Sequence, residues 1–266
     1  MLTDKVALVT GGARGIGAAI ARAMAGHGAR VALLDVDGAE AETTAAGLPT
    51  AGMAVACDAA VEAAVVAAVQ AVVDRFGGLD VLVNNAGLGR PVGVSGRVDD
   101  MSAAAWDEQM AQDLRTTFVT TKAAAPHLKA RGRGAIVNIA SITGLVGSST
   151  QPAQAAAKAG MISLTKSLAL DYAPHDIRVN AICPGFIWTR PWERLVAGLQ
   201  RSVPEFAGLS PRDVFLEVVK RSVPLGREQT LEDVAQLAAF LASEAARNIT
   251  GQWISVDGGL TLRQAH

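Results

Sequence analysis

The chain has 266 residues, with 24 Lys and Arg against 25 Asp and Glu and a formal net charge of −1. Because this charge is close to zero, the chain lacks the basic field that binding to nucleic acid or to an anionic membrane usually needs. Half of the residues are hydrophobic and 18% are charged, which argues against disorder and allows a large buried core.

No linker, repeat or low-complexity tract divides the chain, so we expect a single domain over residues 1–266. Cys57 and Cys183 are too few for a disulfide framework and suit a reducing compartment. The N-terminus carries only a short apolar run, unlike a signal peptide, and the Ala/Val-rich stretch from Ala59 is too polar to span a bilayer. We therefore expect a cytoplasmic protein with no membrane partner.

Short apolar runs alternate with longer segments of helical periodicity. The expected strands are Val6–Val9, Val31–Leu34, Ala54–Ala56, Leu79–Val83, Ala135–Ile139, Ile177–Ile182 and Trp253–Val256. The expected helices are Ile16–Gly26, one from Val61, Ala103–Arg131, Pro152–Ala173 and Leu231–Ser243. Buried runs separated by helices predict an α/β fold, a Rossmann-like, doubly wound parallel sheet with helices on both faces. Such sheets bind ligands beyond the carboxyl ends of their strands.

A glycine-rich turn, Thr10–Gly17, follows the first expected strand and opens directly into a helix. Glycines let the backbone approach a pyrophosphate, whose charge then lies on helix N–H groups, so the turn predicts a dinucleotide site. Asp35 ends the second strand, where a carboxylate can accept hydrogen bonds from ribose hydroxyls and repel a 2′-phosphate. Asp35 could instead cap a helix, and Arg14 could pair with a 2′-phosphate. Asp35 followed by the uncharged Val36 favours NAD over NADP.

The spacing Gly11, Gly15, Gly17 resembles that of the short-chain dehydrogenase/reductase family. Further resemblances follow in order along nearly the whole chain: Asp58, Asn84–Gly87, Ser141, Lys158, Asn180–Gly185, Thr189, Gly251 and Val256–Gly259. The resemblance implies a nicotinamide dinucleotide cofactor. The residues expected to bind it are Gly11, Arg14, Gly15, Ile16, Gly17, Asp35, Val36, Asp58, Ala59, Asn85, Ala86, Gly87, Lys158, Pro184, Gly185, Ile187 and Thr189.

One position departs from the family's pattern at the expected proton donor. The family has a Tyr four residues before the Lys and thirteen after the Ser, and this chain has Gln154 there. The only Tyr, Tyr172, lies fourteen residues beyond Lys158. A Gln amide can donate a hydrogen bond to a carbonyl but cannot relay a proton. General acid–base catalysis contributes about 10²–10⁴-fold, so its loss would slow such an enzyme without abolishing binding.

A second departure is Asp113, which stands where the family has an Asn that supports the proton relay. Its carboxylate could pair with Lys158, act as a base, or be a solvated or structural helix residue. The resemblance assigns Ser141 to the substrate oxygen and Lys158 to the nicotinamide ribose, although Ser141 could merely bond its loop and Lys158 could be a surface residue. The candidate catalytic set is therefore Ser141, Gln154, Lys158 and Asp113.

No metal site is expected, because the four His are scattered without ligand spacing. Residues 184–224 contain five prolines and carry no helix assignment, and they resemble the family's variable substrate lid. Five aromatic residues lie there: Phe186, Trp188, Trp192, Phe206 and Phe215. They could line a pocket for an apolar or ring-containing substrate, or they could pack the lid or a subunit contact. The helices at 103–131 and 152–173 resemble those that form dimers and tetramers in the family.

Three hypotheses follow. The first is an NAD(H)-dependent oxidoreductase that interconverts a secondary alcohol and a ketone on a moderately apolar substrate, with its proton coming from water, Ser141 or Asp113. The second is an NAD-binding lyase, isomerase or cyclase without net redox, and the third is a non-catalytic homologue acting as a partner subunit.

Overall fold

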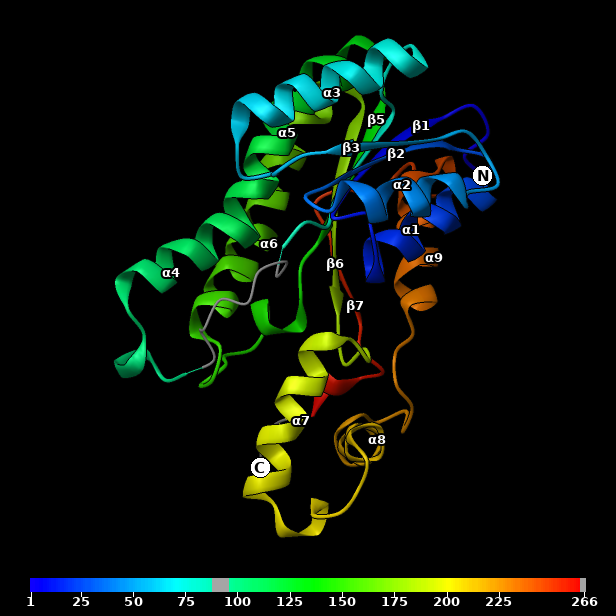
Figure 1. The fold of residues 1–266 in the computed structure, drawn as a ribbon. Coiled ribbons are helices and arrows are strands. Elements are labelled where there is room, and N and C mark those ends of the chain that lie inside the picture. Colours follow the sequence, from blue (N-terminus) through cyan, green and yellow to red (C-terminus); the bar gives the residue numbers. More distant parts are fainter. Residues whose placement is uncertain (88–95, 264–266) are drawn as a thin grey trace.

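The computed structural model describes residues 1–87 and 96–263. These residues form a seven-stranded sheet in which every pair of neighbouring strands is parallel, in the order β3-β2-β1-β4-β5-β6-β7 (Figure 1). The strands are β1 (Val6–Thr10), β2 (Arg30–Asp35), β3 (Gly52–Ala56), β4 (Val81–Asn84), β5 (Gly134–Ile139), β6 (Ile177–Pro184) and β7 (Trp253–Val256). The strand order reverses direction between β1 and β4, and ligands bind at such a switch point.

Helices cover both faces of the sheet. They are α1 (Gly15–Gly26), α2 (Gly38–Ala46), α3 (Glu62–Phe76), α4 (Ala103–Met110), α5 (Thr116–Ala130), α6 (Pro152–Tyr172), α7 (Arg190–Ser202), α8 (Pro211–Ser222) and α9 (Leu231–Ala242). In Figure 1, α3, α5 and α6 lie on one side of the sheet, and α1, α2 and α9 lie on the other. The predicted architecture, a doubly wound parallel sheet, is confirmed.

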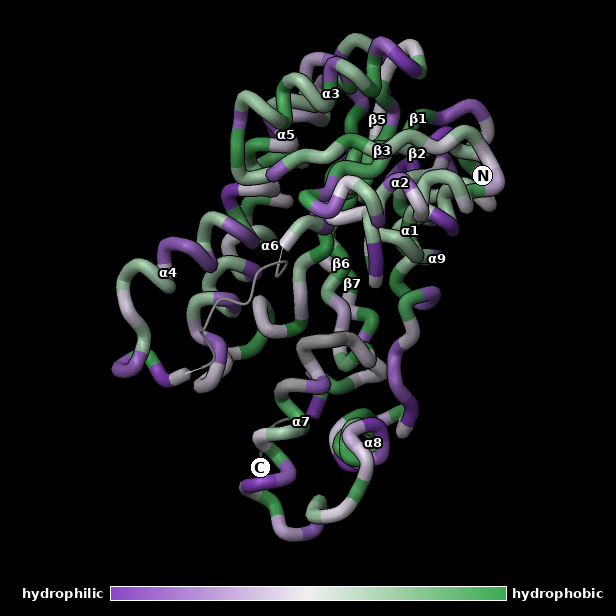
Figure 2. The backbone as a smooth tube through the Cα atoms, viewed as in Figure 1, coloured by the Kyte–Doolittle hydropathy of each residue, from purple (hydrophilic) through white to green (hydrophobic). Residues whose placement is uncertain are grey.

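The sheet is the core of the molecule. All residues of β1 and β4 are buried, whereas the edge strands β3 and β7 are partly exposed. The strands bury branched side chains on both faces, and two large apolar clusters lie between the sheet and its helix layers. Figure 2 shows hydrophobic residues concentrated along the strands, with hydrophilic residues recurring along the surrounding helices. This burial on both faces explains why the strands read as continuous apolar runs.

The structure differs from the expected elements at α2 and within the expected helix over 103–131. Helix α2 was not assigned from the sequence; it begins after Asp37, whose side chain accepts a hydrogen bond from the Glu40 N–H. The expected helix over 103–131 is interrupted by a π-helical turn, Ala111–Arg115, which separates α4 from α5. Hydrophobic periodicity does not register a π turn, because it changes the hydrogen-bond pattern without ending the helix, and such turns are frequent at functional sites.

The lid region also contains helices that the sequence analysis did not assign. Helices α7 and α8 and the 3₁₀ turn Pro204–Phe206 each begin with a proline in their first two positions. Proline is tolerated there, because the N–H that it lacks would have no partner within the helix. The two helices lie together at one end of the molecule, beyond β6 and β7 (Figure 1). In the part of the chain that the structure describes, no helix is long and apolar enough to cross a membrane.

A buried polar network joins the middle of the sheet to the helices. Asn84 on β4 donates to Asn138 on β5 (2.8 Å) and to Thr121 on α5 (3.0 Å). Asn138 in turn donates to Thr165 on α6 at 2.8 Å. Each buried amide is thereby satisfied, which fixes α5 and α6 against the strands that lead into the candidate site.

We expect N138A to lower the free energy of unfolding by about 1–3 kcal/mol, because it leaves buried groups of Asn84 and Thr165 without a partner. Urea denaturation followed by circular dichroism measures this loss. N248A is the matched control, since Asn248 is exposed and its loss should change stability by less than about 0.5 kcal/mol. Equal effects of the two substitutions would contradict a stabilising role for the network.

Candidate active site

The sequence-predicted site residues gather beyond the carboxyl ends of the central strands. The glycine-rich turn follows β1, Asp35 ends β2, Asn85–Gly87 follow β4, Ser141 follows β5, and Pro184 ends β6. Because parallel strands end at the same edge, five separate segments of the chain meet there. Lys158 and Gln154 come from α6, and Asp113 comes from the π turn, so helices on one face complete the group.

The glycine-rich turn brings α1 unusually close to the end of β1. Gly11 and Gly15 have φ angles of +64° and +58°, a region that favours glycine. A Cβ on Gly17 would lie 2.0 Å from the Gly11 carbonyl oxygen, so only glycine fits at that position. Arg14 is the N-cap residue of α1, and Ile16 is part-buried in its first turn. The N-terminus of α1 therefore has the form of an anion-binding helix end.

Asp35 does not cap a helix; Asp37 caps α2 instead. The Asp35 carboxylate accepts hydrogen bonds from the backbone N–H groups of Ala13 and Asp37, each at 3.0 Å. Arg14 pairs with Asp37 and lies 3.7 Å from Glu40. The expected cation for a 2′-phosphate is thus already paired with two carboxylates of the protein.

Residues that follow β2 and β3 flank the glycine-rich turn. Val36 is 60% exposed, an unusual position for a large apolar side chain. The Asp58 carboxylate accepts a hydrogen bond from the Ala60 N–H at 3.0 Å, and Ala59 is buried. An exposed apolar side chain near a carboxylate suits a ligand that has a flat apolar surface beside polar groups.

Thr10 holds the β1 and β4 ends together, and the sequence analysis did not single it out. Its hydroxyl oxygen accepts hydrogen bonds from the N–H groups of Asn85 and Ala86, each at 3.0 Å. The Asn85 side chain donates to the carbonyls of Thr10 and Gly11 at 3.1 and 3.0 Å. The signal available in the sequence was a hydroxyl at the last position of a buried strand, next to the glycine-rich turn.

Lys158 and Asp113 form a buried ion pair. The Lys158 Nζ lies 3.5 Å from the Asp113 Oδ1 and donates to the Ile139 carbonyl at 3.1 Å. Asp113 is fully buried, and its Oδ2 accepts a hydrogen bond from the Gln109 side chain. Asp113 therefore pairs with Lys158, which was one of the alternatives. The alternative of a solvated helix residue is wrong, because Asp113 is fully buried. Gln109 was missed; its helical spacing of four residues from Asp113 was the available signal.

Gly87 lies directly against the Asp113 carboxylate. A Cβ at position 87 would come within 2.4 Å of Asp113 Oδ1, so the carboxylate fills the space that a side chain would need. Asp113 Oδ1 is buried and has no hydrogen-bond partner among the described residues. This oxygen therefore takes part in the ion pair with Lys158, at 3.5 Å, while it accepts no hydrogen bond from the described residues.

Gln154 lies one helical turn before Lys158 on α6 and is 9% exposed. Within residues 1–87 and 96–263, no hydrogen bond joins its side chain to another residue, so both its donor and its acceptor remain available. The Ser141 hydroxyl accepts a hydrogen bond from the Thr143 N–H at 3.2 Å, which leaves its own proton free to be donated. The surface alternative for Lys158 is excluded, since that residue is 5% exposed.

The segment after β6 packs against the C-terminal turn. A Cβ on Gly185 would lie 2.6 Å from the Gln229 Oε1 and 2.8 Å from the Asp257 backbone. Ile187 is buried, and Thr189 is the N-cap residue of α7. Gln229, which the sequence analysis missed, holds this junction with a backbone hydrogen bond to the Phe186 carbonyl at 3.3 Å. Pro184 is the last residue of β6, so the backbone that follows it turns away from the sheet into the lid.

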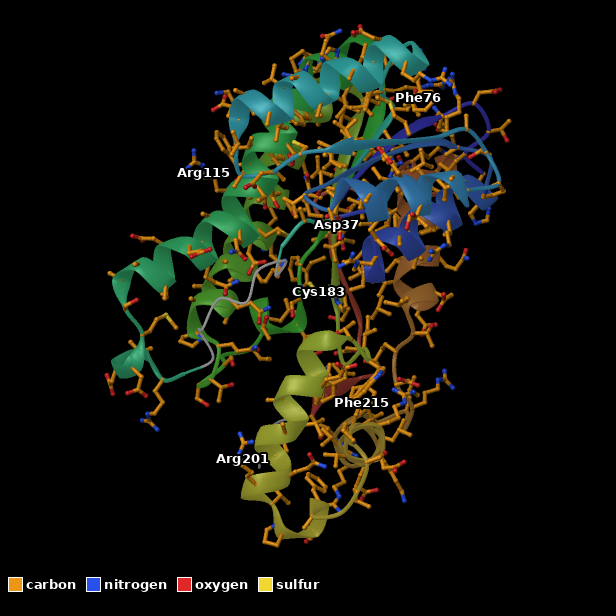
Figure 3. All side chains as sticks on the ribbon, in the orientation of Figure 1. Asp37, Phe76, Arg115, Cys183, Arg201 and Phe215 are labelled. Carbon is orange, nitrogen blue, oxygen red and sulfur yellow. The ribbon has the colours of Figure 1, made fainter. Side chains whose placement is uncertain are left out.

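Cys183 lies on β6, one residue before the strand ends, near the middle of the view in Figure 3. It is fully buried, and desolvation raises the pKa of its thiol to about 11. A neutral, enclosed thiol is a poor nucleophile, so Cys183 supplies packing here.

The aromatic residues of the lid pack mainly on one another. Phe186 and Phe215 each lie 4.8 Å from Trp192 between ring centroids, and Trp188 lies 5.2 Å from Phe215. Phe206 and Phe215 are buried within a cluster formed by α7 and α8. Phe206 and Phe215 therefore pack the lid, as one of the two alternatives predicted. Phe186, Trp188 and Trp192 keep part of their surface exposed.

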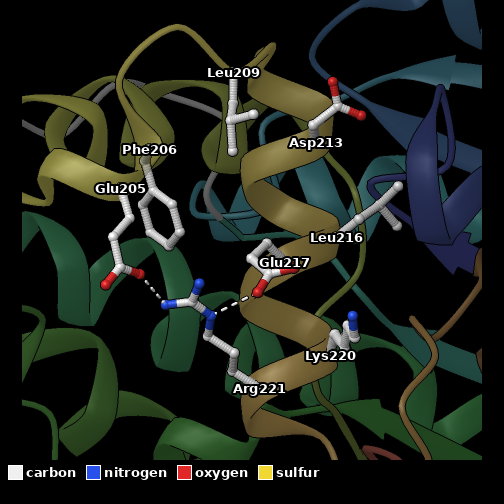
Figure 4. A pocket seen from close by; sticks show the side chains of 8 residues that line it. All are labelled: Glu205, Phe206, Leu209, Asp213, Leu216, Glu217, Lys220 and Arg221. Atoms are coloured by element: carbon white, nitrogen blue, oxygen red, sulfur yellow. Dashed lines mark hydrogen bonds and ion pairs between the residues drawn. The ribbon is translucent and has the colours of Figure 1, made fainter.

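A cavity of about 380 Å³ lies on the lid itself. Figure 4 shows its lining, in which Arg221 is bonded to Glu205 and Glu217 beside the Phe206 ring. A second hollow, of about 400 Å³, lies on the outer side of α4 and α5 and is lined by Met110, Leu114 and Phe118 among others. Neither hollow includes a sequence-predicted site residue. Among the described residues, no group of three or more His, Cys, Asp or Glu could hold a metal ion.

Comparison with known proteins agrees with this geometry. A family model described as enoyl-(acyl carrier protein) reductase matches residues 11–261. A 2-(S)-hydroxypropyl-CoM dehydrogenase of Xanthobacter autotrophicus is 40% identical over 98% of this chain and 98% of its own. A cis-4-hydroxycyclohexanecarboxylate dehydrogenase of Sinomonas cyclohexanicum is 42% identical over 97% of both chains. The crystal structure of levodione reductase superposes with a TM-score of 0.87 and 32% identity, over 99% of this chain and 100% of that one.

The chain belongs to the short-chain dehydrogenase/reductase family. It is an enzyme of the alcohol dehydrogenase and ketoreductase type, and short-chain dehydrogenases use nicotinamide cofactors and small-molecule substrates. This result favours the oxidoreductase hypothesis over the redox-neutral and non-catalytic ones.

We expect G17A to weaken dinucleotide binding by more than ten-fold and to cost about 1–3 kcal/mol of stability, because the new methyl group overlaps the Gly11 carbonyl. Calorimetric titration with NADH and urea denaturation measure the two effects. G26A is the matched control, since Gly26 ends the same helix and a Cβ there meets nothing within 4 Å. If G17A binds NADH as tightly as G26A, the close packing of α1 on β1 is not what shapes the site.

Proposed function

We propose that this enzyme interconverts a secondary alcohol and a ketone with NAD(H), on a small and moderately apolar substrate. The observation that carries the proposal is the arrangement at the carboxyl edge of the sheet. There a glycine-only helix start lies beside Asp35, and the buried side chains of Gln154 and Lys158 lie one helical turn apart on α6. The cradle at Gly11 and Gly17 fits a pyrophosphate, and the bound dinucleotide would supply or accept the hydride.

The charges around the β2 end support NAD over NADP. A 2′-phosphate would add negative charge beside the carboxylates of Asp35, Asp37 and Glu40. Arg14, the cation that could offset it, is engaged by two of these carboxylates. Like charges held close together without a free counter-ion disfavour binding, whereas ribose hydroxyls can donate to Asp35.

The nicotinamide half would lie against the segments that follow β4 and β6. Asn85, Ala86 and Gly87 line one side, and Pro184, Gly185, Ile187 and Thr189 line the other. Val36, Asp58 and Ala59 would flank the adenine. Lys158 would donate to the ribose hydroxyls, because its ammonium has three N–H donors and its two contacts within the protein leave one available.

The proposed catalytic roles are divided among several side chains, and not every one of them can transfer a proton. Ser141 and the Gln154 amide would donate hydrogen bonds to the substrate carbonyl and hold it in place. Gln154 cannot ionise, so the proton on oxygen would come from water, from Ser141, or by way of the Asp113 carboxylate, whose Oδ1 accepts no hydrogen bond from the described residues. Such a site polarises the carbonyl and relies less on a fixed acid.

The partly buried rings of Phe186, Trp188 and Trp192 support a moderately apolar substrate, since they lie on the lid segment that follows β6. Reduction of a panel of small ketones, followed by loss of NADH absorbance, tests this proposal. Steady NADH consumption that depends on the ketone supports it. Consumption of substrate with no change in NADH would instead favour the redox-neutral hypothesis.

We also propose a cytoplasmic homo-oligomer, a dimer or tetramer built through α4, α5 and α6. Phe118 is 52% exposed beside an apolar hollow on α5, and Leu170 on α6 is 80% exposed. Exposed apolar patches of this kind mark interaction surfaces, and the free Cys57 and Cys183 suit a reducing compartment. Sedimentation velocity should give a mass of two or four chains, and a single-chain mass at micromolar concentration would contradict the proposal.

We expect D35A to weaken NAD binding by about ten-fold or more, because charge-assisted hydrogen bonds of about 1.5–3 kcal/mol would be lost. D35N, which keeps an acceptor and removes the charge, should narrow the gap between NAD and NADP. Calorimetric titration of each variant with both cofactors measures these effects. E42A removes an exposed carboxylate from α2 and should bind as the unaltered protein does. An unchanged preference in both Asp35 variants would exclude this role for Asp35.

A further inference from the structure

The ammonium of Lys158 has one counter-ion. Within the described residues, Asp113 is the carboxylate that pairs with it, at 3.5 Å, and both side chains are at most 6% exposed. An ammonium buried away from water is destabilised unless a negative charge and hydrogen-bond acceptors lie next to it. Asp113 supplies the charge, and the Ile139 carbonyl supplies an acceptor.

Asp113 is in turn held firmly in place. Its Oδ2 accepts a hydrogen bond from Gln109 one turn earlier in the helix, and its Oδ1 lies against Gly87 and faces Lys158. Asp113 lies within the π turn at residues 111–115, and this wider turn sets the position of its carboxylate. The pair is therefore fixed from two helices, with little room to separate.

The other titratable groups nearby leave this balance unchanged. Cys183 faces Lys158 from β6, and burial raises the pKa of its thiol to about 11, so the thiol is neutral. Asp257, beyond Cys183, is satisfied by the N–H groups of Gly259 and Thr261 and by the Thr261 hydroxyl. Ser141 and Gln154 are neutral. Among the described residues around this ion pair, one positive and one negative charge therefore balance.

We infer that Asp113 is a positioning residue that acts through Lys158, and that its charge requires position 154 to be neutral. An ionised acid at position 154 would have to share the Lys158 ammonium with the Asp113 carboxylate, which already pairs with it. Repulsion between the two anions would disfavour ionisation of the newcomer. Gln154 and Asp113 are thus a matched pair, in which the neutral amide is the partner that this carboxylate permits. The consequence for catalysis rests on the proposed function, whereas the electrostatic coupling does not.

An introduced phenol tests the coupling directly. The chain has a single Tyr, Tyr172, so the phenolate absorbance of Q154Y minus that of the unaltered protein reports position 154 alone. Burial also raises the pKa of Tyr172, which moves its own titration to higher pH. We expect the proton affinity of the introduced phenol to be at least about ten-fold lower in D113N/Q154Y than in Q154Y, because removing the carboxylate leaves the ammonium to the phenolate.

The matched control is D107N/Q154Y, which removes an exposed carboxylate from α4, the helix that leads into the π turn. It should titrate as Q154Y does. Equal titration of the phenol in D113N/Q154Y and Q154Y would overturn the inference.

A second measurement applies if Q154Y does not fold. D113N should lower the urea midpoint of the protein that contains Lys158, and it should raise the midpoint in the K158M background, where the buried Asp113 carboxylate has lost its counter-ion. Equal losses in the two backgrounds would also overturn the inference.

Neither measurement uses cofactor or substrate. Failure of the coupling would therefore leave the proposed function intact, and failure of NADH turnover would leave the coupling intact. If both proposals hold, D113N/Q154Y should reduce ketones at least about ten-fold faster than Q154Y does, since general acid catalysis is worth about 10²–10⁴-fold. A full gain from Q154Y without D113N would contradict the requirement for a neutral residue at position 154.

Discussion

Lys158 carries a positive charge into the interior of the protein, and the arrangement of the substrate half of the site follows from that charge. The Asp113 carboxylate and the Ile139 carbonyl face the ammonium, and Gln109 holds the carboxylate from behind. Because Asp113 Oδ1 fills the space above position 87, that position must be glycine, and the segment after β4 passes close to α6. A neutral Gln154 one turn away then completes a site whose charges balance without a phenol.

The dinucleotide half obeys a separate constraint, which is steric. Gly17 packs on the Gly11 carbonyl, and Thr10 and Asn85 join the ends of β1 and β4 by hydrogen bonds. Among the described residues, none of these contacts at the glycine-rich turn involves position 154 or 113, so the pyrophosphate end of the site is structurally separate from the acid–base groups. The proposed function relies on this separation, since it combines the glycine-rich turn with Gln154 in place of an ionisable acid.

The sequence predicted the sheet well, because strands buried on both faces appear as continuous apolar runs between glycine-rich turns. It also predicted that Asp35, Ser141 and Lys158 follow or face strand ends. It did not predict α2 or the lid helices, whose capping residues and N-terminal prolines carry little hydrophobic periodicity. Gln229 was not predicted because its contact with Gly185 joins segments far apart in the sequence, which no local pattern encodes. Gln109 was missed although its spacing of four residues from Asp113 is a local helical signal.

The central claim is that a nicotinamide dinucleotide without a 2′-phosphate occupies this edge of the sheet although the family's phenolic acid is missing. Calorimetric titration of the nucleotide-free, unaltered protein with NADH and, separately, with NADPH tests this claim most directly. The account predicts saturable binding of NADH and weaker binding of NADPH. Absence of heat with both cofactors, or tighter binding of NADPH, would contradict it.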